Sequence, residues 1–258
     1  MQLEGRVALV TGAGSGIGRA TADLMAREGA KVAALGPEEE ELRDLVREIG
    51  DERAIAIDAD VSQPDQMERA VRTVIDRWGS LDLVFANAGI NGVWAPLEEL
   101  SPEEWDKTLA INLKGTFLTV KYALPYLKRH GGSIIVTSSV NGTRMFSNTG
   151  ATAYACSKAA QVAFTKMVAV ELAPHKVRVN VICPGAIKTP IHEKTDRRDL
   201  EEVQIPVEFP EGQIPLTHGA QGDPMQVARL VVFLASDAAD HITGTEIWID
   251  GGESLLKG

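Results

Sequence analysis

The sequence predicts a single doubly wound α/β domain over residues 1–258, with about seven parallel strands and helices on both faces of the sheet. Short, nearly continuous apolar runs alternate along the chain with segments of helical periodicity, a pattern typical of a parallel sheet that is covered on both faces. The length of 258 residues and the hydrophobic content of 44% suit one core of that size.

Apolar runs are expected to form the strands, at 6–11, 31–35, 53–57, 81–86, 133–138, 176–182 and 245–249. Helices are expected at 17–28, at 101 to about 129, and at 153–173, where Pro174 ends the last one. Ser101 is a good N-cap, Pro102 suits the first helical position, and Glu104 completes a capping box. The start of the second helix is therefore well defined.

Residues 187–222 break this alternation. The segment contains four prolines and many charged residues, and it is too long for an ordinary connection. It is therefore either disordered or a functional lid. Its position after the carboxyl end of a strand favours a substrate lid.

Composition and charge argue against several classes of protein. The net charge of −10 repels a phosphate backbone, so nucleic acid is not an expected partner. The N-terminus lacks a signal-peptide pattern, and no apolar run approaches the roughly 20 residues that span a bilayer, so we expect no membrane association and a cytoplasmic location. Cys156 and Cys183 are expected to be buried thiols without a disulfide, and the spacing of the histidines predicts no metal site.

A glycine-rich turn follows the first expected strand and opens the first expected helix. Unusual backbone angles, close approach of a pyrophosphate and tight packing of the helix on the strand all require glycine in such a turn. Free N–H groups and the positive end of the helix dipole would then face the phosphates. The residues of this predicted dinucleotide-binding loop are Gly12, Gly14, Ser15, Gly16, Ile17 and Gly18.

The spacing of this turn, T-G-x-x-x-G-x-G from Thr11 to Gly18, resembles that of the short-chain dehydrogenase/reductase family. The resemblance covers nearly the whole chain. It implies a Rossmann-type fold, an NAD(P) cofactor and a homotetramer, with the helices after Pro102 and Ala153 at one interface and the C-terminal segment at another. The glycine spacing and the chain length disfavour the alternative of a sugar epimerase or dehydratase from the extended branch. The further residues expected at the cofactor are Gly36, Asp60, Val61, Asn87, Ala88, Gly89, Tyr154, Lys158, Pro184, Gly185, Ile187 and Thr189.

Tyr154 and Lys158 are the strongest candidates for the chemistry, because residues four apart lie on one face of a helix. Ser139 ends an apolar strand 15 residues before the tyrosine, and the carboxyl ends of such strands bind ligands in open parallel sheets. Tyr154 would exchange a proton with the substrate oxygen, Lys158 would lower the pKa of Tyr154, and Ser139 would hydrogen-bond the substrate oxygen. The resemblance implies that Asn112 completes a proton relay through water to Lys158.

The separation between Ser139 and Tyr154 is longer than usual in the family, and Asn141 would fit the usual spacing. We interpret the extra residues as a longer loop. Ser138 is the alternative to Ser139, although strand alternation points it to the opposite side of the sheet.

The cofactor is expected to be NAD, with NADP left open. Gly36 stands where an acid would bind the ribose 2′-OH of NAD, while Ser15 and Pro37 stand where cations would bind the 2′-phosphate of NADP. Neither signature is therefore present. The acidic run at 38–41 favours NAD because it places negative charge near a 2′-phosphate, whereas Arg19 and Arg43 would favour NADP.

These observations predict an NAD(P)-dependent oxidoreductase that interconverts a secondary alcohol and a ketone on a small molecule, with Tyr154 as general acid and base. The alternative is a cofactor-binding regulatory or scaffold protein, because the fold alone does not fix the function. The residues expected to shape the substrate pocket are Trp94, Asn141, Arg144 and His192.

Overall fold

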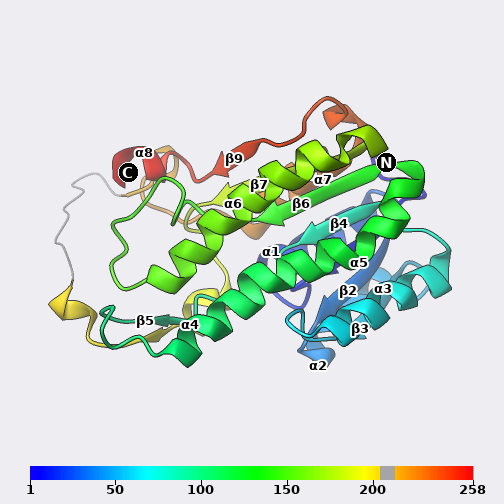
Figure 1. Ribbon diagram of the computed structural model, residues 1–258. Coiled ribbons are helices and arrows are strands. Elements are labelled where there is room, and N and C mark those ends of the chain that lie inside the picture. Colours follow the sequence, from blue (N-terminus) through cyan, green and yellow to red (C-terminus); the bar gives the residue numbers. More distant parts are fainter. Residues whose placement is uncertain (204–212, 258) are drawn as a thin grey trace.

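The computed structural model describes residues 1–203 and 213–257, and its centre is a seven-stranded parallel sheet (Figure 1). The strand order is β3-β2-β1-β4-β6-β7-β9. The strands are β1 (Val7–Thr11), β2 (Lys31–Gly36), β3 (Ala54–Asp58), β4 (Leu83–Ala86), β6 (Gly132–Thr137), β7 (Val177–Pro184) and β9 (Glu246–Ile249). The order reverses direction between β1 and β4, which confirms the predicted doubly wound α/β fold.

Helices cover both faces of the sheet (Figure 1). One face carries α1 (Gly16–Arg27), α2 (Glu39–Ile49) and α7 (Pro224–Ala235), and the other carries α3 (Pro64–Trp78), α5 (Gly115–His130) and α6 (Thr152–Leu172). Successive side chains of a strand enter the two layers in turn, because they point to opposite faces. Leu9 of β1 packs with the α3, α5 and α6 layer, and Val10 packs with the α1, α2 and α7 layer.

The helix predicted from residue 101 to about 129 forms with an interruption. Ser101 and Glu104 make both hydrogen bonds of the predicted capping box at the start of α4 (Pro102–Leu109). A π-helical turn at Ala110–Lys114 then joins α4 to α5. Such turns insert one extra residue into a helix and often mark functional sites. The apolar periodicity gave no sign of it.

The described parts of the segment predicted as a lid pack beside the loop that follows β4. Short 3₁₀ segments form at Pro190–His192, Leu200–Glu202 and Pro215–Thr217. Strand β8 (Asp196–Arg197) pairs in parallel with β5 (Val93–Trp94) in a separate two-stranded sheet. The middle of the lid, 204–212, lies outside the described residues.

Two expectations about the rest of the chain can be compared with the structure. None of the helices in the described ranges combines the length and apolar character that a bilayer span requires. Cys183 is buried as expected, whereas Cys156 is exposed, so the prediction for Cys156 is wrong. Cys156 lies on α6 between Tyr154 and Ser157, and helical geometry turns it away from the face on which those two are buried.

Candidate active site

The glycine-rich turn joins β1 to α1 at the point where the strand order reverses. Gly12 and Gly16 have φ values of +65° and +53°, which favour glycine. A Cβ atom on Gly12 would lie 2.9 Å from the Cα atom of Ala88, and one on Gly18 would lie 2.0 Å from the carbonyl oxygen of Gly12. The turn therefore has no room for side chains at these positions, and its backbone is open to a phosphate group approaching the start of α1.

A cavity of about 440 Å³ extends from this turn along the carboxyl ends of the strands. The predicted cofactor residues that line it are Gly12, Gly14, Ser15, Gly16, Ile17, Gly36, Asp60, Val61, Asn87, Ala88, Gly89, Tyr154, Lys158, Pro184, Gly185, Ile187 and Thr189. Gly18 does not line it, because it packs beneath the turn against Gly12. The glycine turn and a cavity that extends from it to Tyr154 and Gly185 fit a bound dinucleotide.

Tyr154, Lys158 and Ser139 meet in this cavity. Tyr154 and Lys158 lie one turn apart on α6, with the Nζ atom of Lys158 5.5 Å from the centroid of the Tyr154 ring. The Tyr154 side chain is hydrogen-bonded to that of Ser139, just beyond the end of β6. Lys158 donates a hydrogen bond of 2.9 Å to the carbonyl of Thr137. A phenol, a hydroxyl and an ammonium group thus surround one part of the cavity.

The alternative serine is directed elsewhere. The hydroxyl of Ser138 donates to the backbone carbonyl of Lys158 at 2.7 Å. Ser139 instead accepts from the N–H of Asn141 at 3.1 Å and contacts Tyr154. The two serines therefore point to different partners, as strand alternation predicts.

Burial controls the ionisation of the tyrosine and the lysine. Burial raises the pKa of Tyr154 above its ordinary value of 10.0, against the opposing effect of the hydrogen bond with Ser139. The expected lowering of this pKa by Lys158 is not found, because the loss of water around the phenolate is the largest effect and raises the pKa. Burial also lowers the pKa of Lys158 from 10.5 to about 8.

Asn112 lies in the π turn, fully buried behind the cavity rather than on its wall. Its Oδ1 atom accepts from the N–H of Ile90 at 2.8 Å, and its Nδ2 atom donates to the carbonyl of Ile90 at 2.9 Å and to the hydroxyl of Ser157 at 3.0 Å. Ser157 in turn donates to the carbonyl of Tyr154 at 2.7 Å. Asn112 thus connects the loop after β4 to the helix that carries Tyr154.

The backbone carbonyl of Asn112 is occupied as well. It accepts from the Thr116 hydroxyl at 2.7 Å and from the Nε2 atom of Gln161 at 2.9 Å. Both partners are buried. Gln161 lies one turn beyond Lys158 on α6, and neither it nor Thr116 carried a signal in the sequence that would have assigned it to the site.

Three of the four residues expected to shape the substrate pocket line the cavity, namely Trp94, Asn141 and His192. Arg144 does not, so that prediction is wrong. Its guanidinium group stacks on the indole of Trp248, with the Cζ atom 3.5 Å from the ring centroid. Stacking on an aromatic face is a favourable position for a guanidinium group, and it holds Arg144 outside the cavity.

The two ends of the cavity carry different charged groups. The end near α2 has Gly36, Pro37 and Glu38, and the carboxylate of Glu38 lies 3.3 Å from the Nζ atom of Lys194. The other end, beyond β7, has Glu253. The lining residues that sequence reasoning missed are Ala59, Ile90, Asn91, Ile111, Thr137, Val140, Met145, Asn148, Ala186 and Glu253.

The arginines that were expected to favour a phosphate are engaged elsewhere. Arg19 pairs with Glu48 at 2.8 Å and also donates to the carbonyl of Glu41. Arg43 pairs with Glu39 on the same helix. No three potential ligands among the described histidines, cysteines and acids are grouped as a metal site would require.

Contacts with the loop after β4 and with α4 hold residues 190–198. Asn91 donates to the hydroxyl of Thr195 at 2.7 Å, and Arg198 pairs with Glu104 at 2.6 Å. Ile191, His192 and Lys194 lie along the cavity wall. Residues 190–198 therefore form part of the cavity and are connected to α4.

Comparison with known proteins places this geometry in a family. Residues 12–254 match the family model described as enoyl-(acyl carrier protein) reductase. The structure of a 3-ketoacyl-ACP reductase from Sinorhizobium meliloti 1021 is 54% identical in sequence, with a TM-score of 0.93, and the match covers 97% of this chain and 99% of that one. The 3-oxoacyl-[acyl-carrier-protein] reductase FabG of Thermotoga maritima is 41% identical, over 98% of this chain and 99% of its own length.

A third relative bears on the cofactor. The 3-ketoacyl-(acyl-carrier-protein) reductase from Brucella melitensis, whose structure is a complex with NADH, is 32% identical with a TM-score of 0.87, over 98% of this chain and 99% of that one. These matches confirm an NAD(P)-dependent enzyme that acts on CH–OH and C=O groups, and they do not support the regulatory or scaffold alternative. With the glycine turn and the tyrosine–lysine pair in one cavity and near full-length matches at these identities, the chain belongs to the short-chain dehydrogenase/reductase family.

Proposed function

We propose that this protein interconverts a ketone and a secondary alcohol on a small molecule, with Tyr154 transferring the proton. The observation that carries the proposal is the meeting of Tyr154, Ser139 and Lys158 in the cavity that begins at the glycine turn. The nicotinamide supplies or accepts the hydride when it is bound. The protein's part is to hold the carbonyl oxygen and to deliver its proton.

Tyr154 is suited to donate that proton. Burial keeps its pKa above 10, so the phenol is protonated at neutral pH and can give its proton to a carbonyl oxygen. Ser139, hydrogen-bonded to Tyr154, would donate to the same oxygen. Lys158 places its ammonium group near the ring, which favours the phenolate that remains after transfer.

For Asn112 the contacts support a positioning role beside the relay that the resemblance implies. Its Oδ1 atom accepts one hydrogen bond and keeps a second acceptor position for a water molecule. Both ends of the side chain and the backbone carbonyl already have partners, which are Ile90, Ser157, Thr116 and Gln161. We infer that Asn112 holds the loop after β4 against α6.

Replacement of Tyr154 by Phe tests the proposal. The variant should fold and bind cofactor but lose turnover by a factor on the order of 10² to 10⁴, because the proton donor is gone. Tyr126→Phe on α5, away from the cavity, is the matched control and should keep the parent rate. A Tyr154→Phe variant that retained more than half of the parent rate, with hydride transfer limiting in both, would refute the assignment.

The substrate class is best sought with two sets of compounds. Relatives named as reductases of 3-oxoacyl groups on acyl carrier protein make a 3-oxoacyl thioester the first candidate. Side chains of Asn91, Asn141, Asn148 and His192 on the cavity wall offer polar contacts to such a compound or to a polar free ketone. Following NADH absorbance with acetoacetyl thioesters and with cyclic ketones in parallel would distinguish the two sets.

NAD is the proposed cofactor. Glu38 lines the cavity beside Gly36, where it would accept hydrogen bonds from ribose hydroxyls and repel a 2′-phosphate. Lys194, the basic residue nearest to this carboxylate among the described residues, is paired with it. Titration with NADH and NADPH at equal ionic strength tests this proposal, and NADPH binding tenfold tighter would overturn it.

We also propose a homotetramer, as the resemblance implies. The apolar side chains of Phe117 on α5 and of Met167 and Val170 on α6 are exposed, with Val170 at 78%. Burying them between copies of the chain would be favourable. Sedimentation of the purified protein as a monomer at micromolar concentration would contradict the proposal.

A further inference from the structure

A carboxylate enters the cavity from the C-terminal end of the chain. Glu253 is the first residue of the short helix α8 (Glu253–Lys257), and only 4% of its surface is exposed. Its Oε2 atom accepts a hydrogen bond of 2.9 Å from the N–H of Ala186, directly after β7. Glu253 lines the cavity together with Ala186, so a charge from the C-terminal segment is held at the wall.

This carboxylate lies at the reacting end of the cavity. A Cβ atom on Gly185 would lie 2.8 Å from its Oε2 atom, so Glu253 sits directly behind Gly185. Strand β7 pairs with β6, and the N–H of Val140, next to Ser139, donates to the carbonyl of Pro184 at 3.0 Å. Glu253 is therefore close to the strand end that carries Ser139.

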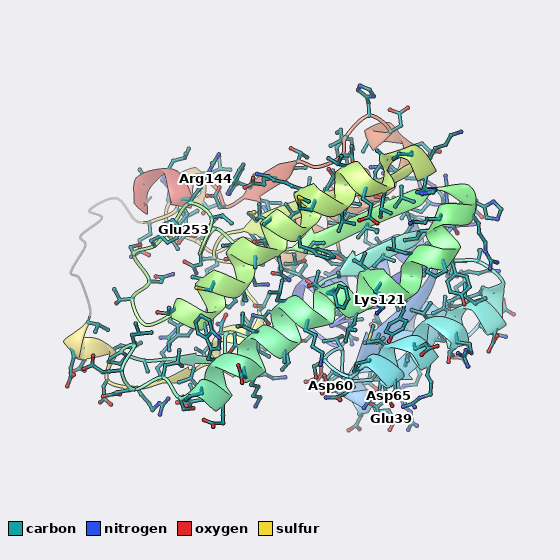
Figure 2. The ribbon with its side chains drawn as sticks, viewed as in Figure 1. Glu39, Asp60, Asp65, Lys121, Arg144 and Glu253 are labelled. Atoms are coloured by element: carbon teal, nitrogen blue, oxygen red, sulfur yellow. The ribbon has the colours of Figure 1, made fainter. Side chains whose placement is uncertain are left out.

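The other acids on the cavity wall lie at the opposite end. Figure 2 shows Glu253 at the end of the molecule that carries α8, whereas Asp60 lies far from it. The acids that line the cavity within the described ranges are Glu38, Asp60 and Glu253. Of these three described acids, Glu253 is the one placed to act on a charge that forms at the reacting end.

Other charged groups of this region, among the described residues, have contacts of their own. Asp250 accepts from the backbone N–H groups of Gly252 and Ser254, and it is not on the wall. Arg144 stacks on Trp248, also away from the wall. Lys158 is the cation at the reacting end, and it donates to Thr137 beneath Tyr154.

This carboxylate is relevant to the reaction because hydride transfer changes the charge of the nicotinamide ring. Reduction moves a hydride, with its two electrons, from the nicotinamide ring to the carbonyl carbon, while Tyr154 delivers a proton to the oxygen. The ring is neutral before this step and positively charged after it. A buried negative charge close by therefore stabilises the oxidised ring and has little effect on the reduced ring.

We propose that Glu253 makes the cavity bind the oxidised, cationic nicotinamide more tightly than the neutral reduced form, and so favours carbonyl reduction on the protein. This inference rests on the proposed function, because it requires the nicotinamide ring beside Tyr154 and Ser139. It assigns Glu253 as a positioning residue for Ala186 and as an electrostatic determinant of the redox form that is bound.

The test is the ratio of the dissociation constants of NADH and NAD⁺, measured by titration of the parent protein and of variants. Glu253→Gln keeps an oxygen that can accept from Ala186 but removes the charge. We expect it to weaken NAD⁺ binding by roughly tenfold relative to NADH, which corresponds to about 1.4 kcal/mol. Glu253→Ala should shift the ratio equally while weakening both forms, and Glu253→Asp should keep the parent ratio.

The matched control is Glu38→Gln, which removes a carboxylate at the other end of the cavity. It should change the affinities of both forms together and leave their ratio within twofold of the parent value. An unchanged ratio in both neutral variants at Glu253, or an equal shift in Glu38→Gln, would overturn the inference. Failure of the parent to bind either form would instead refute the proposed function.

Discussion

A methyl group added at Gly18 should destabilise the fold, although Gly18 itself does not line the cavity. Its Cβ atom would lie 2.0 Å from the carbonyl oxygen and 2.7 Å from the carbonyl carbon of Gly12, and 2.8 Å from Nδ2 of Asn87. A backbone oxygen cannot rotate away, so α1 must move off β1. Overpacking of this kind costs about 1–3 kcal/mol, while alanine in a helix returns about 1 kcal/mol relative to glycine. Because the clash is with backbone, we expect a net loss of about 2 kcal/mol for Gly18→Ala.

Gly14→Ala is the matched control within the same turn. Its Cβ atom would meet the Oε2 atom of Glu41 at 2.7 Å, and this is the far end of a flexible side chain that can move aside. The free energy of unfolding should therefore fall by less than in Gly18→Ala. NADH affinity should fall, because Gly14 lines the cavity and Gly18 does not.

Urea unfolding followed by circular dichroism gives both free energies, and NADH titration gives the affinities. The slope with urea should stay the same in all three proteins, since a change in slope would mean that the unfolded state had changed. If Gly18→Ala were as stable as the parent, the packing argument would be wrong. If Gly14→Ala lost more stability than Gly18→Ala, the turn would be held by contacts other than those described.

Further changes test the cap, the buried lysine and the π turn. Ser101→Ala should lose about 1 kcal/mol in urea unfolding, because the capping hydrogen bond to Glu104 is lost, and no loss would contradict the cap. The parent should gain stability as the pH rises from about 8 to 9, because folded Lys158 is neutral there while the unfolded lysine is still protonated. Above pH 9 the buried Cys183 thiol, with a folded pKa of about 11, opposes the gain, and Lys158→Met should abolish the rise below pH 9. Asn112→Ala should leave Ile90 without its two side-chain partners and cost on the order of 3 kcal/mol, and undiminished protection of the Ile90 amide in hydrogen exchange would refute this.

The parts of the fold that could be predicted are those that depend on residues close together in the sequence. The strands of the sheet follow from short apolar runs, and the capping box follows from Ser101, Pro102 and Glu104. The π turn around Asn112 could not be predicted, because an extra residue in one turn leaves the apolar periodicity on either side intact. It is held by contacts to Ile90 and Gln161, which lie on other elements.

The candidate site divides in the same way. The glycine turn and the Tyr154–Lys158 pair are compact motifs, and the structure brings both to one cavity. Arg144 was misplaced because its partner, Trp248, is on the distant strand β9, and nothing close in sequence indicated the stacking. Glu253 was missed for the same reason, since only the folded chain brings the C-terminal helix behind Gly185.

Gly36 and Glu38 show why a rule tied to sequence position can fail. The acid that marks an NAD enzyme is expected at the end of the second strand, and glycine stands there. Glu38 nevertheless lines the cavity, and a Cβ atom on Gly36 would lie 3.8 Å from its Oε2 atom, so the carboxylate lies next to the space that an acid at position 36 would use. A ribose hydroxyl responds to where an oxygen lies and not to which residue supplies it. A 2′-phosphate would have to displace that carboxylate from Lys194, and this cost supports NAD although the usual signature is absent.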